Sequence, residues 1–302
     1  MFTLAHISDP HIPPMPIVNR GDLMNKRALG YFNWQRRRSA IHHADTLETL
    51  VSDLKACPHD HIAITGDLVN IAHPVEYPRA RAWLENLGSP ADVTLVPGNH
   101  DAYVREGVVA MERNWAPYMR GDDGESFPFV RRRGPIAIIG LSSAVPTLPF
   151  MGTGRLGGDQ LAKFETLLTK LGDEGLFRVV MIHHPPVMKL SGFFKRLTDS
   201  AQFRAILERH GTELLLHGHD HARTLMLLNG RNPPIPSLSA PSASAAPGAT
   251  AQAAGYNLFE IAGKPGAWRC TVVARILSGN GTITSLPRYA VVLPQTAEDA
   301  GR

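Results

Sequence analysis

The sequence contains little cysteine and no long uninterrupted hydrophobic run. Cys57 and Cys270 are the only cysteines in 302 residues, too few for a disulfide framework, so we expect free thiols in a reducing compartment. No apolar run reaches the roughly 18 residues that a membrane-spanning helix needs. The N-terminus lacks the basic start and apolar core of a signal peptide. We therefore expect a cytoplasmic protein, at most peripheral at the inner membrane surface.

The sequence also lacks a strong charge of either sign. Its formal net charge is +4 and its isoelectric point is near 9.2, which gives no reason to expect nucleic-acid binding but would suit an anionic small molecule. Hydrophobic residues make up 43% of the chain, enough for the core of one α/β domain. We expect a single domain over residues 1–293 and a frayed tail over residues 294–302. The oligomeric state stays open, a homodimer included.

Apolar runs of strand length alternate with helical patterns along the chain. Helical spacing predicts helices near residues 44–56, 77–87, 106–115, 159–171 and 200–208. The alternation with strands is typical of an α/β protein. From residue 224 onward the chain is strand-rich. Within that part, Pro, Ser and Ala dominate residues 233–254, which we interpret as a long loop or lid.

Polar side chains follow the predicted strands at the points where they end. They are Asp9, His11, Asp67, Asn99, His100, His183, His217 and His219. Because the carboxyl ends of strands in an α/β sheet meet at one edge, these side chains should converge. Imidazole, carboxylate and amide donors without thiolate suit manganese, iron or zinc and argue against a sulfur-rich structural zinc site. This donor set favours a two-metal hydrolase.

Five short motifs carry these residues. They are Asp9-Pro10-His11, Gly66-Asp67, Gly98-Asn99-His100-Asp101, His183-His184-Pro185 and His217-Gly218-His219. In this order they resemble the signature of the calcineurin-like metallophosphoesterases, over residues 1 to about 225. The resemblance implies an α/β fold of four layers, α-β-β-α, in which two mixed sheets are flanked by helices.

The resemblance also implies a role for each matched residue. It implies one metal ion held by Asp9, His11, Asp67 and His219, and a second held by Asp67, Asn99, His183 and His217. Asp67 would bridge the two ions, a divalent or mixed-valence pair of manganese (Mn), iron (Fe) or zinc (Zn). A hydroxide between the ions would attack phosphorus while His100 acts on the leaving group. Asp67 and His100 are therefore the expected catalytic residues.

Within the family, the chain is most similar to the bacterial cyclic-nucleotide phosphodiesterase branch, which implies a phosphodiesterase for a small phosphate ester such as a 3',5'-cyclic nucleotide. Residues 13–40 and 187–197 depart from that branch. Their mixture of aromatic, aliphatic and basic residues is interpreted either as ordinary loops with solvated basic faces or as a cap. Such a cap would receive an amphipathic substrate or rest on an anionic membrane surface.

Two alternatives to the cyclic-nucleotide function stay open. One is hydrolysis of a lipid-linked phosphate or pyrophosphate ester at the membrane surface, as in the related diacylglucosamine pyrophosphatases. The other is a non-catalytic scaffold that keeps the fold. Retention of every matched ligand residue and of His100 argues against the scaffold.

The remaining histidines are expected to have structural positions. We interpret His42, His43, His59, His61 and His73 as surface or turn residues. His184 and His221 flank the predicted ligands and are candidates for supporting them.

Overall fold

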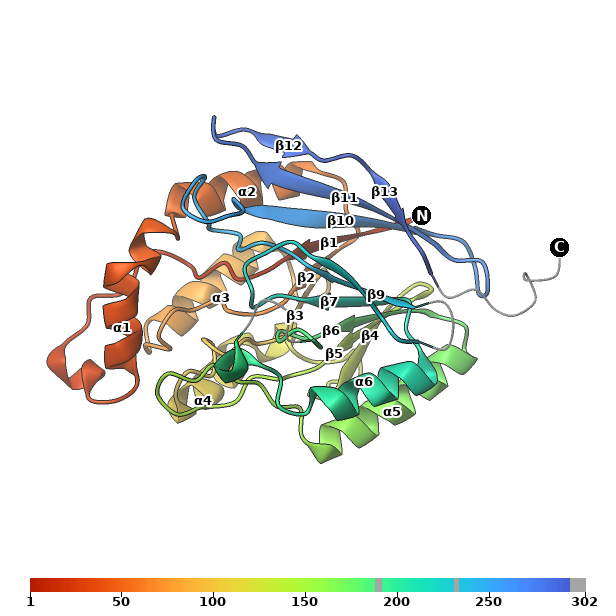
Figure 1. Ribbon diagram of the computed structural model, residues 1–302, viewed down its shortest axis with the longest axis horizontal. Coiled ribbons are helices and arrows are strands. Elements are labelled where there is room, and N and C mark those ends of the chain that lie inside the picture. The colour runs from red at the N-terminus through yellow and green to blue at the C-terminus, as the bar shows by residue number, and fades with distance from the viewer. Residues whose placement is uncertain (188–191, 231–233, 294–302) are drawn as a thin grey trace.

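The computed structural model describes residues 1–187, 192–230 and 234–293. Two β-sheets stack face to face, and helices cover the outer face of each sheet (Figure 1). Both sheets contain parallel and antiparallel neighbours. The predicted four-layer α-β-β-α fold is confirmed.

The first sheet contains the N-terminal strand near its middle. Its order is β12 (Ile283–Ser285), β11 (Arg269–Leu277), β10 (Gly255–Ala262), β1 (Phe2–Ile7), β2 (His61–Ile64) and β3 (Val93–Leu95), and β13 (Tyr289–Val291) also pairs with β11. Strands β1, β2 and β3 run parallel, whereas β10 is antiparallel to β1. The turns after β1, β2 and β3 therefore lie at the same edge of this sheet.

The second sheet has a parallel centre and antiparallel edges. Its order is β4 (Phe129–Arg133), β5 (Ile136–Gly140), β6 (Phe177–Met181), β7 (Leu214–His217), β9 (Ile235–Ser239) and β8 (Leu225–Leu228). Strands β5, β6, β7 and β9 run parallel, and β4 and β8 close the two edges as antiparallel partners.

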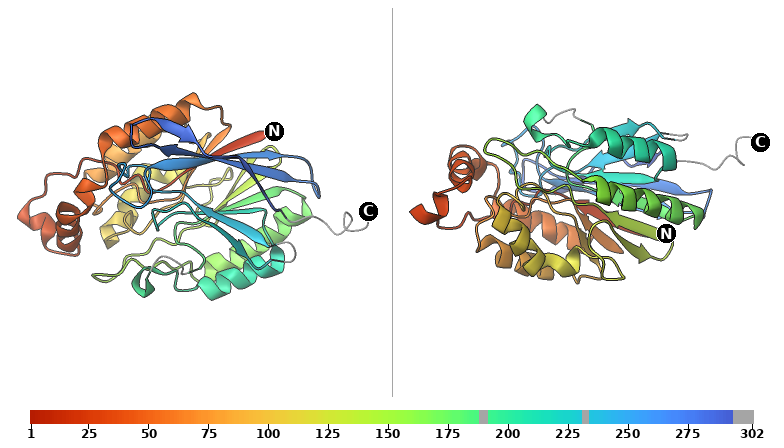
Figure 2. Two further views of the ribbon diagram at one scale, coloured as in Figure 1. Left: turned by 45° about the horizontal axis from the view of Figure 1, so that its top comes forward. Right: turned by 90° about the horizontal axis from the view of Figure 1, so that it is seen from below.

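Helices cover the two sheets from opposite sides (Figure 2). The first sheet packs against α2 (Ala44–Ala56), α3 (Glu76–Leu87) and α4 (Arg105–Trp115), and the second against α5 (Gly158–Asp173) and α6 (Ser200–His210). The bounds lie within two residues of the predicted helices, because each helix carries an apolar stripe at helical spacing. No helix in the described part of the chain is long and apolar enough to cross a membrane.

Successive side chains of each central strand point to opposite faces of its sheet, and both faces are buried. In β1, Leu4 packs between the sheets, whereas Ala5 and Ile7 face the helices. In β6, Val179 faces the first sheet and Val180 faces α5 and α6. Because both faces of these strands are buried, their sequences are continuous apolar runs, which explains why they could be located from the sequence.

The interpretation of residues 233–254 as a long loop or lid is wrong for β9. All five residues of β9 are buried, and the strand pairs with both β7 and β8. Pro236 pairs only on the β8 side, and the ladder to β7 begins at Ser237, so the missing N–H breaks no bond with β7. The strand could not be recognised from the sequence, because proline and serine occupy positions at which strands usually have β-branched residues.

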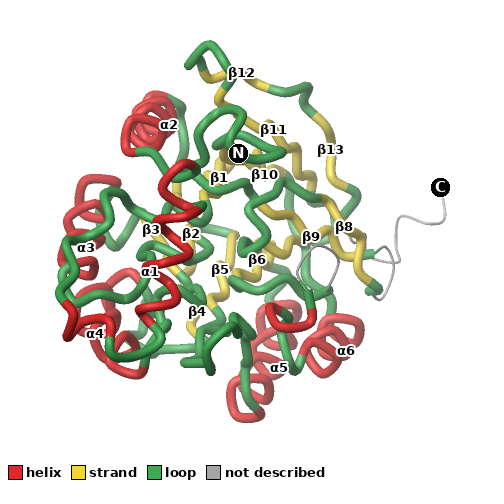
Figure 3. The backbone as a smooth tube through the Cα atoms, turned by 60° about the vertical axis from the view of Figure 1, so that its left-hand side comes forward, coloured by secondary structure: helices red, strands yellow, loops and turns green. Residues whose placement is uncertain are grey.

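The long segment between β1 and α2 stands at the end of the molecule where the parallel strands terminate. It contains the 3-10 turn η1 (Arg20–Leu23), helix α1 (Arg27–Arg36) and the 3-10 turn η2 (Arg38–Ala40). Figure 3, which looks toward this end, shows α1 in front of β2 and β3. Further short 3-10 turns are η3 (Ala116–Tyr118) and η4 (Phe193–Lys195).

Candidate metal centre

The turns that follow the parallel strands hold their polar residues in an unusual backbone conformation. Among the described residues, positive φ angles at non-glycine positions occur at Asp9, His11, Asp67, Ala72, Phe150, His219 and His221. Most of these residues carry a carboxylate or an imidazole. Left-handed backbone is disfavoured for side chains with a Cβ and clusters at functional sites. The conformation therefore marks one edge of the sheets as a functional site.

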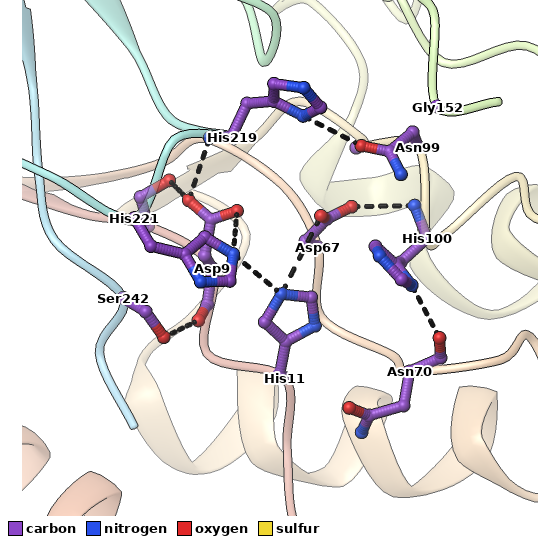
Figure 4. Close-up of polar contacts among 12 residues, drawn as sticks. Asp9, His11, Asp67, Asn70, Asn99, His100, Gly152, His219, His221 and Ser242 are labelled. Carbon is purple, nitrogen blue, oxygen red and sulfur yellow. Dashed lines mark hydrogen bonds and ion pairs between the residues drawn. The ribbon is translucent and has the colours of Figure 1, made fainter. Parts of the chain in front are cut away.

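A first group of donor atoms forms around Asp9 and His11 (Figure 4). The Nε2 atoms of His11 and His221 lie 3.1 Å apart, and His221 Nε2 lies 3.4 Å from Asp9 Oδ1. Asp67 Oδ2 lies 3.8 Å from His11 Nε2. One donor atom from each of these four residues lies within 4.8 Å of the others.

A second group forms on the other side of Asp67. His219 Nδ1 lies 2.9 Å from Asn99 Oδ1 and 3.2 Å from His183 Nε2. His183 Nε2 is 3.3 Å from Asn99 Oδ1 and 3.5 Å from Asp67 Oδ2. The same Asp67 oxygen therefore faces both groups.

The other oxygen of Asp67 has a structural partner. Its Oδ1 accepts a hydrogen bond of 2.7 Å from the backbone N–H of His100. Gly98 leaves room for this carboxylate, since a Cβ at that position would lie 2.1 Å from Asp67 Oδ1. Only Oδ2 of Asp67 is therefore directed at both groups.

The histidines after β7 are arranged differently from the sequence prediction. The ring of His221, not that of His219, lies beside Asp9 and His11. The backbone N–H of His219 donates to Asp9 Oδ2 at 3.1 Å, but its ring occupies the position expected for His217. His217 is the last residue of β7, one residue beyond the predicted end of the strand. Its Nε2 is buried without a hydrogen-bond partner among the described residues, and its Nδ1 lies 3.4 Å from Gly218 O. The His-x-His pair at the site is therefore His219 and His221.

Backbone carbonyls orient two of the rings. His11 Nδ1 lies 3.2 Å from Val69 O, and His183 Nδ1 lies 2.6 Å from Thr65 O. A carbonyl only accepts, so each Nδ1 carries the proton and each Nε2 keeps its lone pair, directed into the site. This is the arrangement in which imidazole binds a metal ion.

Asp101 holds the turns after β2 and β3 together. Its carboxylate accepts hydrogen bonds from the backbone N–H groups of Asp67, Leu68, Val69 and Gly98 at 2.8–3.1 Å. Burial and the Asp67 carboxylate raise the pKa of Asp101 to about 7. The sequence showed this residue as part of a motif but gave no sign of its bonding, which depends on a turn 34 positions away.

His100 is partly exposed, unlike the buried rings of His11 and His183. Its Nδ1 is 2.5 Å from Asn70 O, so Nδ1 carries the proton and Nε2 is left to accept. One guanidinium nitrogen of Arg38 lies 3.1 Å from that Nε2. Burial, and then the Arg38 charge, hold the pKa of His100 well below its usual value.

Several histidines outside the predicted set are not surface residues. His42, His61 and His73 are buried, which corrects their interpretation as surface or turn residues, whereas His43 is exposed and His59 is partly exposed. The His42 ring centroid lies 4.6 Å from that of His11. The His61 ring is held by Thr94 of β3 and the His42 ring by Ser244, and neither contact leaves a periodic pattern in the sequence.

His184 and the loop of residues 147–152 line the side of the site next to Asn99. His184 Nε2 lies 3.0 Å from Gly152 O, and the His184 ring centroid is 4.6 Å from that of His219. Lys26 Nζ donates to Met151 O at 2.8 Å, and the Gly152 N–H donates to Phe194 O at 2.9 Å. The segments that the sequence predicts as a cap therefore both contact this loop, although residues 188–191 lie outside the described part.

The loop of residues 147–152 and the turn η4 form what we call the mouth of the site, and both carry exposed aromatic side chains. Phe150, Phe193 and Phe194 are 84%, 59% and 60% exposed, respectively. The Arg196 guanidinium carbon lies 3.5 Å from the centroid of the Phe193 ring. The mouth thus combines apolar and cationic surface.

The charges of the site fit metal ions. Burial alone would raise the pKa of Asp9, but His221, His183 and the Ser8 hydroxyl lower it to about 2. Burial and the Asp9 charge raise the pKa of Asp67 well above its usual value. Asp9 Oδ1 is buried without a hydrogen-bond partner among the described residues. Two repelling buried carboxylates among imidazole lone pairs favour a cation between them.

This fold and donor set define a class of protein, the metal-dependent phosphoesterases. The family model of the calcineurin-like phosphoesterases matches residues 2–223, and the chain belongs to this family. It is accordingly a metal-dependent phosphoric ester hydrolase. The resemblance stated from the motifs is confirmed.

Curated relatives carry phosphodiesterase names. The chain is 30% identical over 226 residues to a probable cyclic nucleotide phosphodiesterase of Synechococcus sp., covering 73% of each chain. It is 28% identical over 225 residues to the glycerophosphodiester phosphodiesterase GpdQ of Enterobacter lignolyticus, covering 74% of this chain and 72% of the relative. Both are similar to this chain over most of their length.

Solved structures share the fold at low sequence identity. A dimetal phosphatase from Danio rerio aligns with a TM-score of 0.59 and 13% identity, covering 97% of this chain and 99% of that one. A purple acid phosphatase from yellow lupin aligns with a TM-score of 0.62 and 13% identity, covering 96% of this chain and 53% of that one. At this identity the likeness shows the fold alone.

Proposed function

We propose that this chain is a dinuclear phosphodiesterase that hydrolyses a phosphate diester of a small molecule, with a 3',5'-cyclic nucleotide as the first candidate. The observation that carries the proposal is the position of Asp67 Oδ2, which lies 3.8 Å from His11 Nε2 and 3.5 Å from His183 Nε2. One carboxylate oxygen shared between two donor groups is suited to bridging two ions. The names of the two curated relatives support the diester.

The donor groups assign ligands to each ion in this proposal. Asp9, His11, Asp67 and His221 would hold one ion. Asp67, Asn99, His183 and His219 would hold the other. Two ions of manganese, iron or zinc would supply the charge that polarises the phosphoryl oxygens and makes water nucleophilic at neutral pH.

His100 would act on the leaving oxygen through its Nε2. The hydrogen bond from Nδ1 to Asn70 O fixes the ring and directs Nε2 away from that carbonyl. Donation requires a proton on Nε2, and an anionic ester bound beside the ring favours that protonated form. His100 would then pass this proton to the departing alkoxide.

We also propose that residues 1–293 form one domain whose segments 13–40 and 187–197 cap the site. Contacts of Lys26 and Phe194 with the loop of residues 147–152 support this. The exposed rings of Phe150, Phe193 and Phe194 favour a second candidate substrate, a lipid-linked phosphate or pyrophosphate ester. Apolar rings beside a cation suit an amphipathic molecule.

A turnover panel with manganese present tests these proposals. We expect bis(p-nitrophenyl) phosphate to be hydrolysed faster than p-nitrophenyl phosphate, and cyclic AMP to be hydrolysed as well. Turnover of a nucleotide-linked lipid without turnover of cyclic AMP would favour the second candidate. The variant Asp67→Ala is the control for contaminating activity. Full metal occupancy without turnover of any ester would refute the phosphodiesterase and support a non-catalytic scaffold.

A further inference from the structure

Arg38 reaches into the site from the segment between β1 and α2. It is the first residue of η2, and its guanidinium contacts two rings of the site. One nitrogen, Nη2, lies 2.7 Å from His11 Nε2, and the other, Nη1, lies 3.1 Å from His100 Nε2. Arg38 is therefore not part of a solvated basic face, unlike its exposed neighbours Arg36 and Arg37.

The main chain around Arg38 is fixed to the rest of the fold. The carbonyl of Arg38 accepts the N–H groups of Ile41 and His42 at 3.0 and 2.9 Å. Ile41 O accepts the N–H of Ala246 at 2.8 Å. On the other side, Arg27 at the start of α1 donates to Ala72 O at 2.9 Å. The backbone of Arg38 is therefore held in place, and the guanidinium can move only through rotations of the Arg38 side chain.

The contact with His11 competes with metal binding. His11 Nδ1 carries the proton, so Nε2 has one lone pair, which accepts the hydrogen bond from Arg38. A metal ion bound by an imidazole lies about 2.0–2.1 Å from the nitrogen and uses that same lone pair. The guanidinium must therefore leave His11 when this ring binds an ion, while the backbone of Arg38 keeps it near His100.

We propose that Arg38 is a phosphate-binding residue, whose guanidinium leaves His11 on metal binding and contacts the phosphoryl oxygens of the bound ester beside His100. A guanidinium and nearby metal ions repel each other, and an anion bound between them offsets this repulsion. A planar guanidinium can bind two oxygens of a phosphoryl group at once. This proposal rests on the proposed function and deepens it. Arg38 would hold the phosphoryl group in place, whereas His100 acts on the leaving oxygen.

Two binding measurements test the role of Arg38 without relying on turnover. Calorimetry with inorganic phosphate on manganese-loaded protein should show about 10- to 100-fold weaker binding for Arg38→Gln, the usual loss of a charged hydrogen bond. Titration of the metal-free protein with manganese, in the absence of phosphate, should show several-fold tighter binding for Arg38→Gln, because the competing cation is gone. Arg38→Lys should keep part of the phosphate affinity.

The opposite signs of the two effects separate this role from a structural one. A variant that merely disturbs the loop would weaken manganese binding as well, and that result would overturn the proposal. Unchanged phosphate affinity in Arg38→Gln would also overturn it. Arg37→Gln removes a neighbouring exposed charge and should change both affinities less than twofold. If the unaltered protein hydrolyses no ester, the proposed function fails, but the phosphate titrations still decide whether Arg38 binds phosphate.

Discussion

The buried ring of His61, which lies at the start of β2 and not at the metal centre, should make the free energy of unfolding decrease at acidic pH. His61 opens β2, is fully buried, and has Nε2 2.7 Å from Thr94 Oγ1. Burial, followed by the charges of Arg133 and Arg131, lowers its pKa from 6.5 to about 3. The folded protein therefore keeps this ring neutral at a pH at which the unfolded chain takes up a proton.

The magnitude follows from the two pKa values. Because the folded pKa is depressed, stability is fully present above pH 6.5 and is lost as the pH falls toward 3. Between pH 7 and pH 5, proton uptake by the unfolded chain at this one ring removes about 2 kcal/mol from the free energy of unfolding. The variant His61→Gln should lack this loss, whatever its stability at pH 7.

Urea unfolding at pH 7, 6 and 5, with a chelator present so that metal binding does not contribute, measures the effect. The drop in the free energy of unfolding from pH 7 to pH 5 should be about 2 kcal/mol smaller in His61→Gln than in the unaltered protein. His43→Gln removes an exposed ring and is the control, since that ring is solvated in both states. Equal pH dependence of His61→Gln and the unaltered protein would refute the reasoning.

Three further predictions concern the metal centre. Asp67→Ala should lose both ions, because Oδ2 faces both donor groups; two full equivalents in metal analysis would contradict the bridge. His221→Ala should retain only one equivalent of metal, whereas His217→Ala should retain two, and the reverse result would restore the ligand set expected from the sequence. His100→Gln should keep its metals but lose roughly 10² to 10⁴ in rate. That loss should shrink for a good leaving group such as p-nitrophenolate, and equal losses for good and poor leaving groups would count against the role.

Short-range patterns in the sequence predicted the helices and most of the strands, and the resemblance of the motifs implied the four layers. Strands buried on both faces are continuous apolar runs, and donors at their ends could be located once those ends were known. The choice among His217, His219 and His221 turned on a single residue, since β7 extends through His217. Because the predicted strand ended one residue too early, the sequence analysis chose His217 and His219, whereas the rings at the site are those of His219 and His221.

The features that the sequence did not predict depend on contacts between distant segments. Strand β9 is held by pairing with β7 and β8 and not by its own composition. Arg38 belongs to a segment whose path from β1 is set by anchors such as the bond from Arg27 to Ala72 O. No spacing in the chain shows that the run Arg36-Arg37-Arg38 directs its last arginine at His11 and the two before it at solvent.

The antiparallel pairing of β1 with β10 has a consequence for synthesis of the protein. β1 is complete after residue 7, but its partner β10 begins at Gly255. At ribosomal rates, roughly 10 to 50 s separate the two strands. During that interval one edge of β1 has no partner and is a template for pairing with another chain. His221, the fourth member of the donor group around Asp9, also emerges late, so the nascent chain cannot complete its first metal site until most of it has left the ribosome.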